Sequence, residues 1–186
     1  MPITVNENGV LHELTDVTVN EGGTLHTLDT VHANESGVLR EIHSGIPRSL
    51  TWTADTSKDS AAKINSVSAD GMTVTYTCKS NAWTFGNAAV YSNYFSLPAG
   101  AIITAEFSNA SGGGTSGKYA GIFLETGSAI VNGTQSGGSL GTRTDTLNVT
   151  AAGTYRLALH AHSVTGGQSG VNYYSCTATV KITITK

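Results

Sequence analysis

ITVNENGVLHELTD (residues 3–16), VTVNEGGTLHTLDT (17–30) and VHANESGVLREIHS (31–44) are one 14-residue unit written three times without a gap. Copies of one unit adopt the same local structure, so this period decides how the first part of the chain is built. Four columns are identical in every copy: Asn6/Asn20/Asn34, Glu7/Glu21/Glu35, Gly9/Gly23/Gly37 and Leu11/Leu25/Leu39. We predict that these columns define a repeated arm, distinct from the rest of the chain.

Each copy predicts a short β-hairpin, because strand-like residues flank the pattern Asn-Glu-x-Gly. Asn at the first position and Gly at the fourth suit a type I turn. A Gly after such a turn often takes positive φ and closes the hairpin as a bulge, whereas other residues would be strained there. The invariant glycine column is therefore expected at the turn.

The arm is expected to depend on other chains for its stability. Each copy offers only a few apolar side chains, whereas ordering about 42 residues costs roughly 1–2 kcal/mol for each of them. We therefore predict an assembly element that trimerises with identical arms or lies along the surface of a larger particle.

Charge and hydropathy exclude several classes of partner. Residues 3–44 hold seven acidic side chains and one basic one, and the remainder holds six acids and nine bases, so nucleic acid is not an expected partner. No run of 18 apolar residues occurs, so we expect no membrane insertion. The start, MPITVNENG, lacks the basic and apolar regions of a secretory signal. Synthesis in a host cytoplasm, with release by a route such as lysis, is expected.

Gly45-Ile46-Pro47 interrupts the repeat and indicates a boundary. We assign residues 1–44 to the arm, 45–58 to a hinge and first strand, and 59–186 to a head domain. The head shows apolar residues at every second position in several short runs separated by Gly-rich turns. The runs are residues 72–78, 103–107, 119–124, 155–162 and 176–185. The sequence therefore predicts an all-β chain, a short β-repeat arm followed by an antiparallel, jelly-roll-like β-sandwich.

The cysteines, Cys78 and Cys176, fall on the inward faces of an early and a late strand, which often neighbour each other in a jelly roll. They either form a disulfide or remain two buried thiols. The second alternative is common in proteins made in a reducing cytoplasm, and we favour it.

No catalytic motif is present, and we predict neither an enzyme nor a bound cofactor. A glycosidase would need two carboxyl groups across one cleft. Glu106 and Glu125 are the only glutamates of the head, and both are expected to face solvent on strands.

His160 and His162 are the only weak candidates for metal ligands, and we predict no metal site. On a strand they share one side, opposite the apolar residues Tyr155, Leu157 and Leu159. Around a threefold axis, three such pairs could hold a transition metal. We favour the alternative, two exposed polar residues on an outer face.

Five aromatic residues are candidates for stacking on sugar rings: Trp83, Tyr91, Tyr94, Tyr173 and Tyr174. Neighbours on a strand point oppositely, so one of Tyr173 and Tyr174 must face outward. Trp83 is the strongest candidate because it lies in a polar loop. The alternative for each ring is packing in the core.

The copies NENGVLHEL, NEGGTLHTL and NESGVLREI resemble the N-terminal repeats of structural proteins from phages and prophages of gut Firmicutes. The head, with FSLPAGAIITAEF and AAGTYRLALHAHS, resembles the jelly-roll heads of phage fibres, carbohydrate-binding modules and TNF/C1q-like trimers. The resemblance implies a virion part, such as a tail fibre, receptor-binding protein or head decoration, that is usually trimeric.

Taken together, these features predict a non-enzymatic phage virion structural protein. The arm would attach to other virion proteins or trimerise, and the displayed head would bind glycans of the host surface. The alternative is a carbohydrate-binding module of a bacterial surface or secreted protein. The position on a virion, head or tail, stays open.

Overall fold

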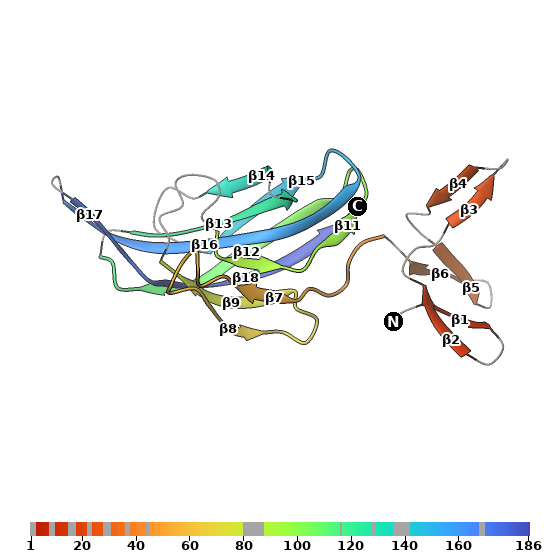
Figure 1. Cartoon of the computed structure of the whole chain (residues 1–186), viewed down its shortest axis with the longest axis horizontal. Helices are drawn as coiled ribbons and strands as arrows, with labels where there is room; N and C mark the ends of the chain where they lie inside the picture. The colour runs from red at the N-terminus through yellow and green to blue at the C-terminus, as the bar shows by residue number, and fades with distance from the viewer. Residues whose placement is uncertain are drawn as a thin grey trace. The chain divides into compact units, whose positions relative to one another are not determined.

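The structure, a computed structural model, describes residues 3–7, 10–14, 18–21, 24–27, 31–35, 38–43, 45–79, 88–115, 117–127, 129–135, 142–167 and 170–186. The chain divides into two compact units, Met1–Pro47 and Arg48–Lys186. We call them the arm and the head (Figure 1). No helix in these ranges is long and apolar enough to cross a membrane.

The arm contains one antiparallel hairpin for each copy of the repeat, which confirms a short β-repeat arm. The strands are β1 (Ile3–Glu7) with β2 (Val10–Leu14), β3 (Thr18–Glu21) with β4 (Thr24–Thr27), and β5 (Val31–Glu35) with β6 (Val38–His43). Each pair forms a two-stranded sheet of its own.

The invariant Asn and Leu columns face each other across every hairpin. The pairs are Asn6 opposite Leu11, Asn20 opposite Leu25, and Asn34 opposite Leu39. The repeat in the sequence is therefore also a repeat in strand register. The side chains of these columns lie outside the described residues, so their role as assembly contacts stays a prediction.

The predicted position of the turn is wrong by one residue in all three copies. A type I turn beginning at the Asn column would put that column at the first turn position, but Asn6, Asn20 and Asn34 lie inside β1, β3 and β5. The last pair of each hairpin comes one residue later, as in Glu7 with Val10.

This register leaves two connecting residues in each hairpin. Two-residue connections of the mirror-image turn types match the twist of the strands better than a type I turn does. With a two-residue connection, the Asn column belongs to the paired part of each strand, opposite the Leu column. The connecting residues, including Gly9, Gly23 and Gly37, lie outside the described residues.

The head consists of two antiparallel sheets that form a β-sandwich, as the alternation predicts. One sheet has the order β14-β13-β16-β10-β7, with β11 and β17 also paired to β16. Its strands are β7 (Trp52–Ala54), β10 (Val90–Ser92), β11 (Phe95–Leu97), β13 (Gly117–Thr126), β14 (Ala129–Gln135), β16 (Gly153–Gly167) and β17 (Gly170–Tyr174).

The second sheet has the order β15-β12-β18-β9-β8. Its strands are β8 (Lys63–Val67), β9 (Thr73–Cys78), β12 (Ile102–Gly112), β15 (Arg143–Asn148) and β18 (Cys176–Thr185). Late strand β18 lies between early strand β9 and β12, so the two cysteine-bearing strands are neighbours.

The core lies between the two sheets. Its largest fully buried apolar side chains come from both inner faces: Tyr76, Ile103, Phe107, Leu147 and Ile182 from one sheet, and Ile122, Leu124, Leu157 and Leu159 from the other. Tyr76 also links the sheets, because its hydroxyl donates to the carbonyl of His160 at 3.0 Å. A buried phenol needs such a partner.

Strand β16, the long blue strand of the head in Figure 1, is buried on both faces. Every residue from 157 to 164 is buried. The expectation that the outer face of this strand is exposed to solvent is therefore wrong. Part of the outer face is covered by a second apolar cluster of Ala88, Tyr91, Phe123 and Ala158, against which Ile130 packs. The alternation correctly predicts which residues share a face, but the outer face is also packed.

Candidate functional site

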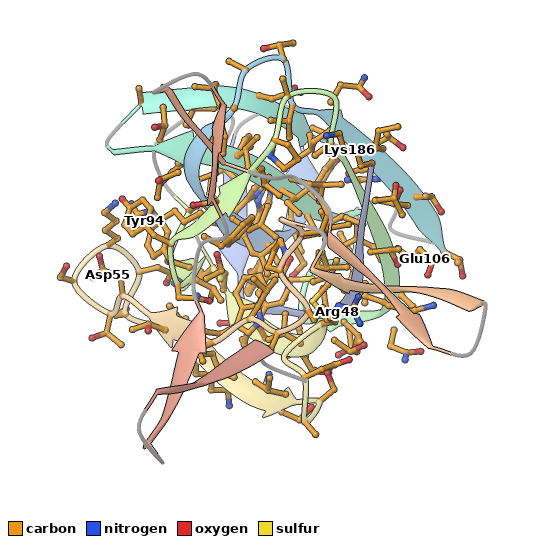
Figure 2. All side chains as sticks on the ribbon, turned by 90° about the vertical axis from the view of Figure 1, so that its right-hand side faces the viewer. Arg48, Asp55, Tyr94, Glu106 and Lys186 are labelled. Carbon is orange, nitrogen blue, oxygen red and sulfur yellow. The ribbon has the colours of Figure 1, made fainter. Side chains whose placement is uncertain are left out.

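An open hollow of about 550 Å³ lies at the end of the first sheet that is formed by β10 and β7. It is lined by the end of β7 and the turn after it, by β10, and by one residue of β16: Thr53, Ala54, Asp55, Thr56, Ser57, Lys58, Tyr91, Ser92 and Arg156. Figure 2 shows Asp55 and Tyr94 on one side of the head and Glu106 and Lys186 on the other.

Strand β10 brings the walls of the hollow together. It pairs with β7 on one side and with β16 on the other, so Tyr91 lies opposite both Thr53 and Ala158. Arg156 lies two residues before Ala158 on the same face of β16, because alternate residues of a strand point the same way. Three segments that are far apart in the sequence therefore form one site.

The turn that follows β7 is held by Asp55. Its carboxylate accepts hydrogen bonds from the backbone N–H of Ser57 at 3.1 Å and from the Ser57 hydroxyl at 2.5 Å. The Asp55 N–H donates to the carbonyl of Ala89 at 2.7 Å. Hydrogen bonding, chiefly from the Ser57 hydroxyl, lowers the pKa of the Asp55 carboxyl, so Asp55 is ionised at neutral pH.

Arg156 is fixed between two tyrosine rings and a buried carboxylate. Its guanidinium carbon lies 4.1 Å from the ring centroid of Tyr91 and 5.3 Å from that of Tyr94. Its Nε donates to Oε2 of Glu125 at 2.8 Å, and its Nη2 forms an ion pair with the same oxygen at 2.8 Å. Charge-assisted bonds and cation–π contacts hold the guanidinium in a single orientation.

Glu125 was expected to face solvent, and that expectation is wrong, since its side chain is only 7% exposed. The carboxylate tolerates burial because it lies directly opposite Arg156 in the pairing of β13 with β16. Removing a carboxylate from water is costly unless a cation and hydrogen bonds replace the water. Glu106, by contrast, is 48% exposed and pairs with Lys181 on the outer face of the second sheet.

Lys58 approaches the same ring as Arg156 from another direction. Its ammonium donates to the Tyr91 hydroxyl at 2.7 Å and lies 4.9 Å from the ring centroid. These two distances place the ammonium at the hydroxyl end of the ring and not above its face. The Tyr91 hydroxyl in turn donates to the carbonyl of Ala88.

Tyr94 presents an exposed ring next to Arg156, although it is not among the residues that line the hollow. The residue is 46% exposed, and its hydroxyl donates to the carbonyl of Gly127 at 2.9 Å. Gly127 has a φ of 58° in the turn between β13 and β14, a conformation that suits glycine. The ring is therefore fixed at its backbone and at its hydroxyl, which limits the entropy lost when a ligand packs on it.

The five predicted aromatic candidates do not form one group. Tyr91 and Tyr94 meet around Arg156, although Tyr91 itself is buried. Tyr173 and Tyr174 lie on β17, where Tyr173 pairs with Val164, about 26 Å along β16 from Arg156 at 3.3 Å per residue. Tyr174 is 39% exposed, as expected of one of that pair. Trp83 lies outside the described residues.

His160 and His162 share the outer face of β16 as expected, but both are fully buried, so their predicted exposure is wrong. They belong to a row of four rings in which Tyr119 stacks on His162 at 4.9 Å, His162 on His160 at 6.1 Å, and His160 on Phe123 at 5.3 Å between centroids. The two histidines and Phe123 are closed to solvent, whereas Tyr119 at the end of the row is half-buried. The described residues contain no cluster of three potential metal ligands.

Gly121 explains why a histidine ring fits there. It lies opposite His160 on β13, and a Cβ at this position would be 2.2 Å from Nε2 of His160. Burial is the main cause, and electrostatic interactions with His162 and Arg143 add to it, so that the pKa of His160 is lowered to about 3. The ring is therefore neutral at ordinary pH.

The cysteines lie directly opposite each other, Cys176 on β18 against Cys78 on β9, and both are buried thiols. Burial raises the pKa of Cys78 to about 12 and that of Cys176 to about 11. The thiolate is the reactive form, so both groups are inert toward nucleophilic chemistry in the folded head.

Arg156 was missed by the sequence analysis. An arginine at an alternate position of a strand usually faces solvent, and only the neighbouring Glu125 and the two tyrosines mark it as fixed. The acid on β13 and the base on β16 are too far apart in the sequence to indicate a pair.

Neither a family model nor a curated protein matches the chain. Among the solved structures that do match, one is described as "CBM4 structure and function". It is 10% identical with a TM-score of 0.42, and the match covers 75% of this chain and 87% of that one. A likeness at this level carries no weight for function, so the fold assignment rests on the two sheets themselves.

Proposed function

We propose that the head binds a carbohydrate at the hollow beside Arg156. The observation that carries this proposal is the exposed Tyr94 ring, which lies 5.3 Å from the guanidinium carbon of Arg156 and is held by its hydroxyl. Binding sites for small ligands combine an apolar surface with a few fixed polar groups in a concavity. Here the Tyr94 ring beside Arg156 is the apolar surface, and Arg156 and Lys58, which line the hollow, are the polar groups.

This combination suits a sugar more than a purely apolar ligand. One face of a pyranose ring carries C–H groups that pack on an aromatic ring, while its hydroxyl groups need hydrogen-bond partners in the plane of the sugar. The guanidinium is held by Glu125 and the tyrosines before any ligand arrives. A pre-ordered site loses little conformational entropy on binding.

A binding role fits the carboxyl groups at this site better than catalysis does. Hydrolysis of a glycosidic bond needs one carboxyl group with a raised pKa as general acid. The pKa of Asp55 is lowered, and Glu125 is bound to Arg156 and nearly buried. We therefore propose a non-enzymatic module.

The test is a Tyr94→Ala variant of the full chain, assayed on a panel of immobilised short oligosaccharides. Tyr174→Ala is the matched control, because Tyr174 is also an exposed tyrosine but lies at the far end of β16. We expect at least a tenfold loss of affinity for Tyr94→Ala and none for Tyr174→Ala. Equal binding by both variants, or no binding by the unaltered chain, contradicts the proposal.

We further propose that the arm is an assembly element, and the observation that favours this is its division into three two-stranded sheets. An isolated two-stranded hairpin is at best marginally stable in water, so these hairpins require a surface against which to pack. Identical arms in a homotrimer or other virion proteins would provide it. The virion context follows from the resemblance of the repeats and stays a prediction.

Light scattering coupled to size exclusion tests the assembly proposal. The full chain is expected to be an oligomer, and a chain without residues 1–44 is expected to be a monomer with unchanged glycan binding. A full-length monomer whose arm resists protease would refute this role for the arm.

A further inference from the structure

We propose that the sugar held in the hollow carries an anionic group, a carboxylate or a phosphate. This inference rests on the proposed carbohydrate binding and specifies its ligand class. The feature that carries it is the convergence of two cations, Lys58 and Arg156, on the single ring of Tyr91.

The two cations are close enough to contact one anionic group or two neighbouring ones. The ammonium nitrogen of Lys58 lies 4.9 Å from the Tyr91 centroid, and the guanidinium carbon of Arg156 lies 4.1 Å from it. The charges are therefore at most about 9 Å apart. Both residues line the hollow. Like charges held this close favour an anion between them.

Both nearby carboxylates interact with these cations, because Glu125 is paired with Arg156 and the charge of Lys58 is the smallest of the causes that lower the pKa of Asp55. Glu125 is paired with Arg156 but is not among the residues that line the hollow. Asp55 does line it, but its Oδ1 accepts two hydrogen bonds from Ser57 within its own turn. Among the lining residues, two are cationic and one is anionic; with Glu125 behind Arg156 the four charges balance, so the attraction for an anion comes from the cationic donors that line the hollow.

Both cations retain hydrogen-bond donors that can be directed at a ligand. A guanidinium has five N–H donors, and Glu125 engages only Nε and Nη2 of Arg156, so the two hydrogens of Nη1 remain. An ammonium has three donors, and the Tyr91 hydroxyl accepts one from Lys58. Carboxylate and phosphate oxygens are the acceptors that form the strongest bonds to such donors.

Tyr94 lies where it could hold the ring of a sugar whose anionic group contacts the two cations. Arg156 lies close to both the buried Tyr91 ring and the exposed Tyr94 ring. An acidic sugar could therefore pack its ring on Tyr94 and direct its acidic group past Arg156 toward Lys58. Sugars with a carboxylate on the ring and sugar phosphates share this chemistry.

The experiment measures binding of the full chain to three matched pairs of probes. These are oligogalacturonate with its methyl ester, sialyllactose with lactose, and mannose 6-phosphate with mannose. We expect at least one acidic member to bind tenfold or more tightly than its neutral partner, with an affinity that falls as salt is raised. A preference confined to carboxylates or to the phosphate supports the inference and identifies the anionic group.

Lys58→Met is the diagnostic variant, because Lys58 is exposed and methionine keeps much of its apolar stem. It is expected to reduce the affinity for the acidic member much more than the affinity for the neutral one, and so to lose most of the preference for the acidic member. Lys63→Met is the control, since Lys63 is an exposed lysine on β8 outside the hollow and its loss changes the net charge equally.

The outcomes separate this inference from the proposed function. If neutral sugars bind as well as acidic ones and Lys58→Met changes neither, the anion inference is overturned and carbohydrate binding stands. If Lys58→Met and Lys63→Met reduce acidic binding equally, the effect is general charge and the inference is also overturned. If no glycan binds, or Tyr94→Ala has no effect, both proposals are overturned.

Discussion

The buried ring of His160 predicts that the head loses stability as the pH falls below 6.5. Burial holds the pKa of His160 near 3 in the folded head, against an ordinary value of 6.5. The unfolded chain therefore takes up a proton in a pH range where the folded chain does not. The stability associated with the neutral ring is complete above pH 6.5, and it is lost progressively until the pH reaches about 3.

The size of this loss follows from the same two values. Each pH unit in that range costs about 1.4 kcal/mol for one proton, so at pH 5 the head is less stable by about 2 kcal/mol than at pH 7. Domains are stable by only about 5–15 kcal/mol, so the change is readily measured.

The assay is urea unfolding at pH 7 and pH 5, followed by tryptophan fluorescence. Trp52 reports on the head, because its indole N–H donates to the carbonyl of Gly71 at 2.7 Å. The comparison is with His160→Leu, which keeps an apolar side chain in the row of rings but cannot be protonated. We expect the unaltered head to lose about 2 kcal/mol more than this variant between the two pH values.

The stability of the His160→Leu variant at pH 7 does not affect the comparison, because the quantity compared is the change in the free energy of unfolding between pH 7 and pH 5. Equal losses in the two proteins would refute the reasoning, as would an imidazole of His160 that titrates near pH 6.5 in the folded head. Either result would show that water or a cryptic partner reaches the ring.

Three further predictions follow from the packing and the charges. Gly121→Ala places a Cβ 2.2 Å from His160 Nε2 and should destabilise the head by about 1–3 kcal/mol in thermal melts. The control is Gly113→Ala, whose Cβ would be 3.6 Å from the nearest atom and which should cost far less. Equal melting temperatures of the two variants would contradict this prediction. Glu125→Gln leaves Arg156 without its buried partner and should lower the free energy of unfolding in urea by about 2–4 kcal/mol. Glu106→Gln breaks an exposed pair and should lower it by less than about 0.5 kcal/mol. Similar losses in the two variants would refute the distinction. Both cysteines should react with a thiol reagent only after unfolding, and rapid labelling of the native chain would be the opposite result.

The site shows how far alternation along a strand can be taken. The alternation of residues along the strand correctly placed His160 and His162 together, on the side of β16 opposite Leu157 and Leu159. It could not predict that this side is covered, because alternation compares neighbours in one strand and contains no information about what packs on them. Gly121, which makes room for the His160 ring, is on a different strand.

The same limit applies to the hollow. The nearness of Tyr94 to Tyr91 in the sequence made both reasonable candidates, but the partner that joins them, Arg156, comes from another strand. Its carboxylate partner, Glu125, comes from a third. These contacts depend on which strands become neighbours in the sheet, and the order of strands in a sheet does not follow their order in the chain.

The sequence alone determined the local structure of this protein. The 14-residue period predicts one hairpin for each copy, and the alternation in the head predicts strands, two antiparallel sheets and inward-facing cysteines, because these depend on residues close together in the chain. Only the tertiary structure decided that both faces of β16 are buried, that Glu125 is paired, and that two cations meet at Tyr91. Those features depend on contacts between strands that are distant in the sequence, and their energies come from burial and pairing that no single strand contains.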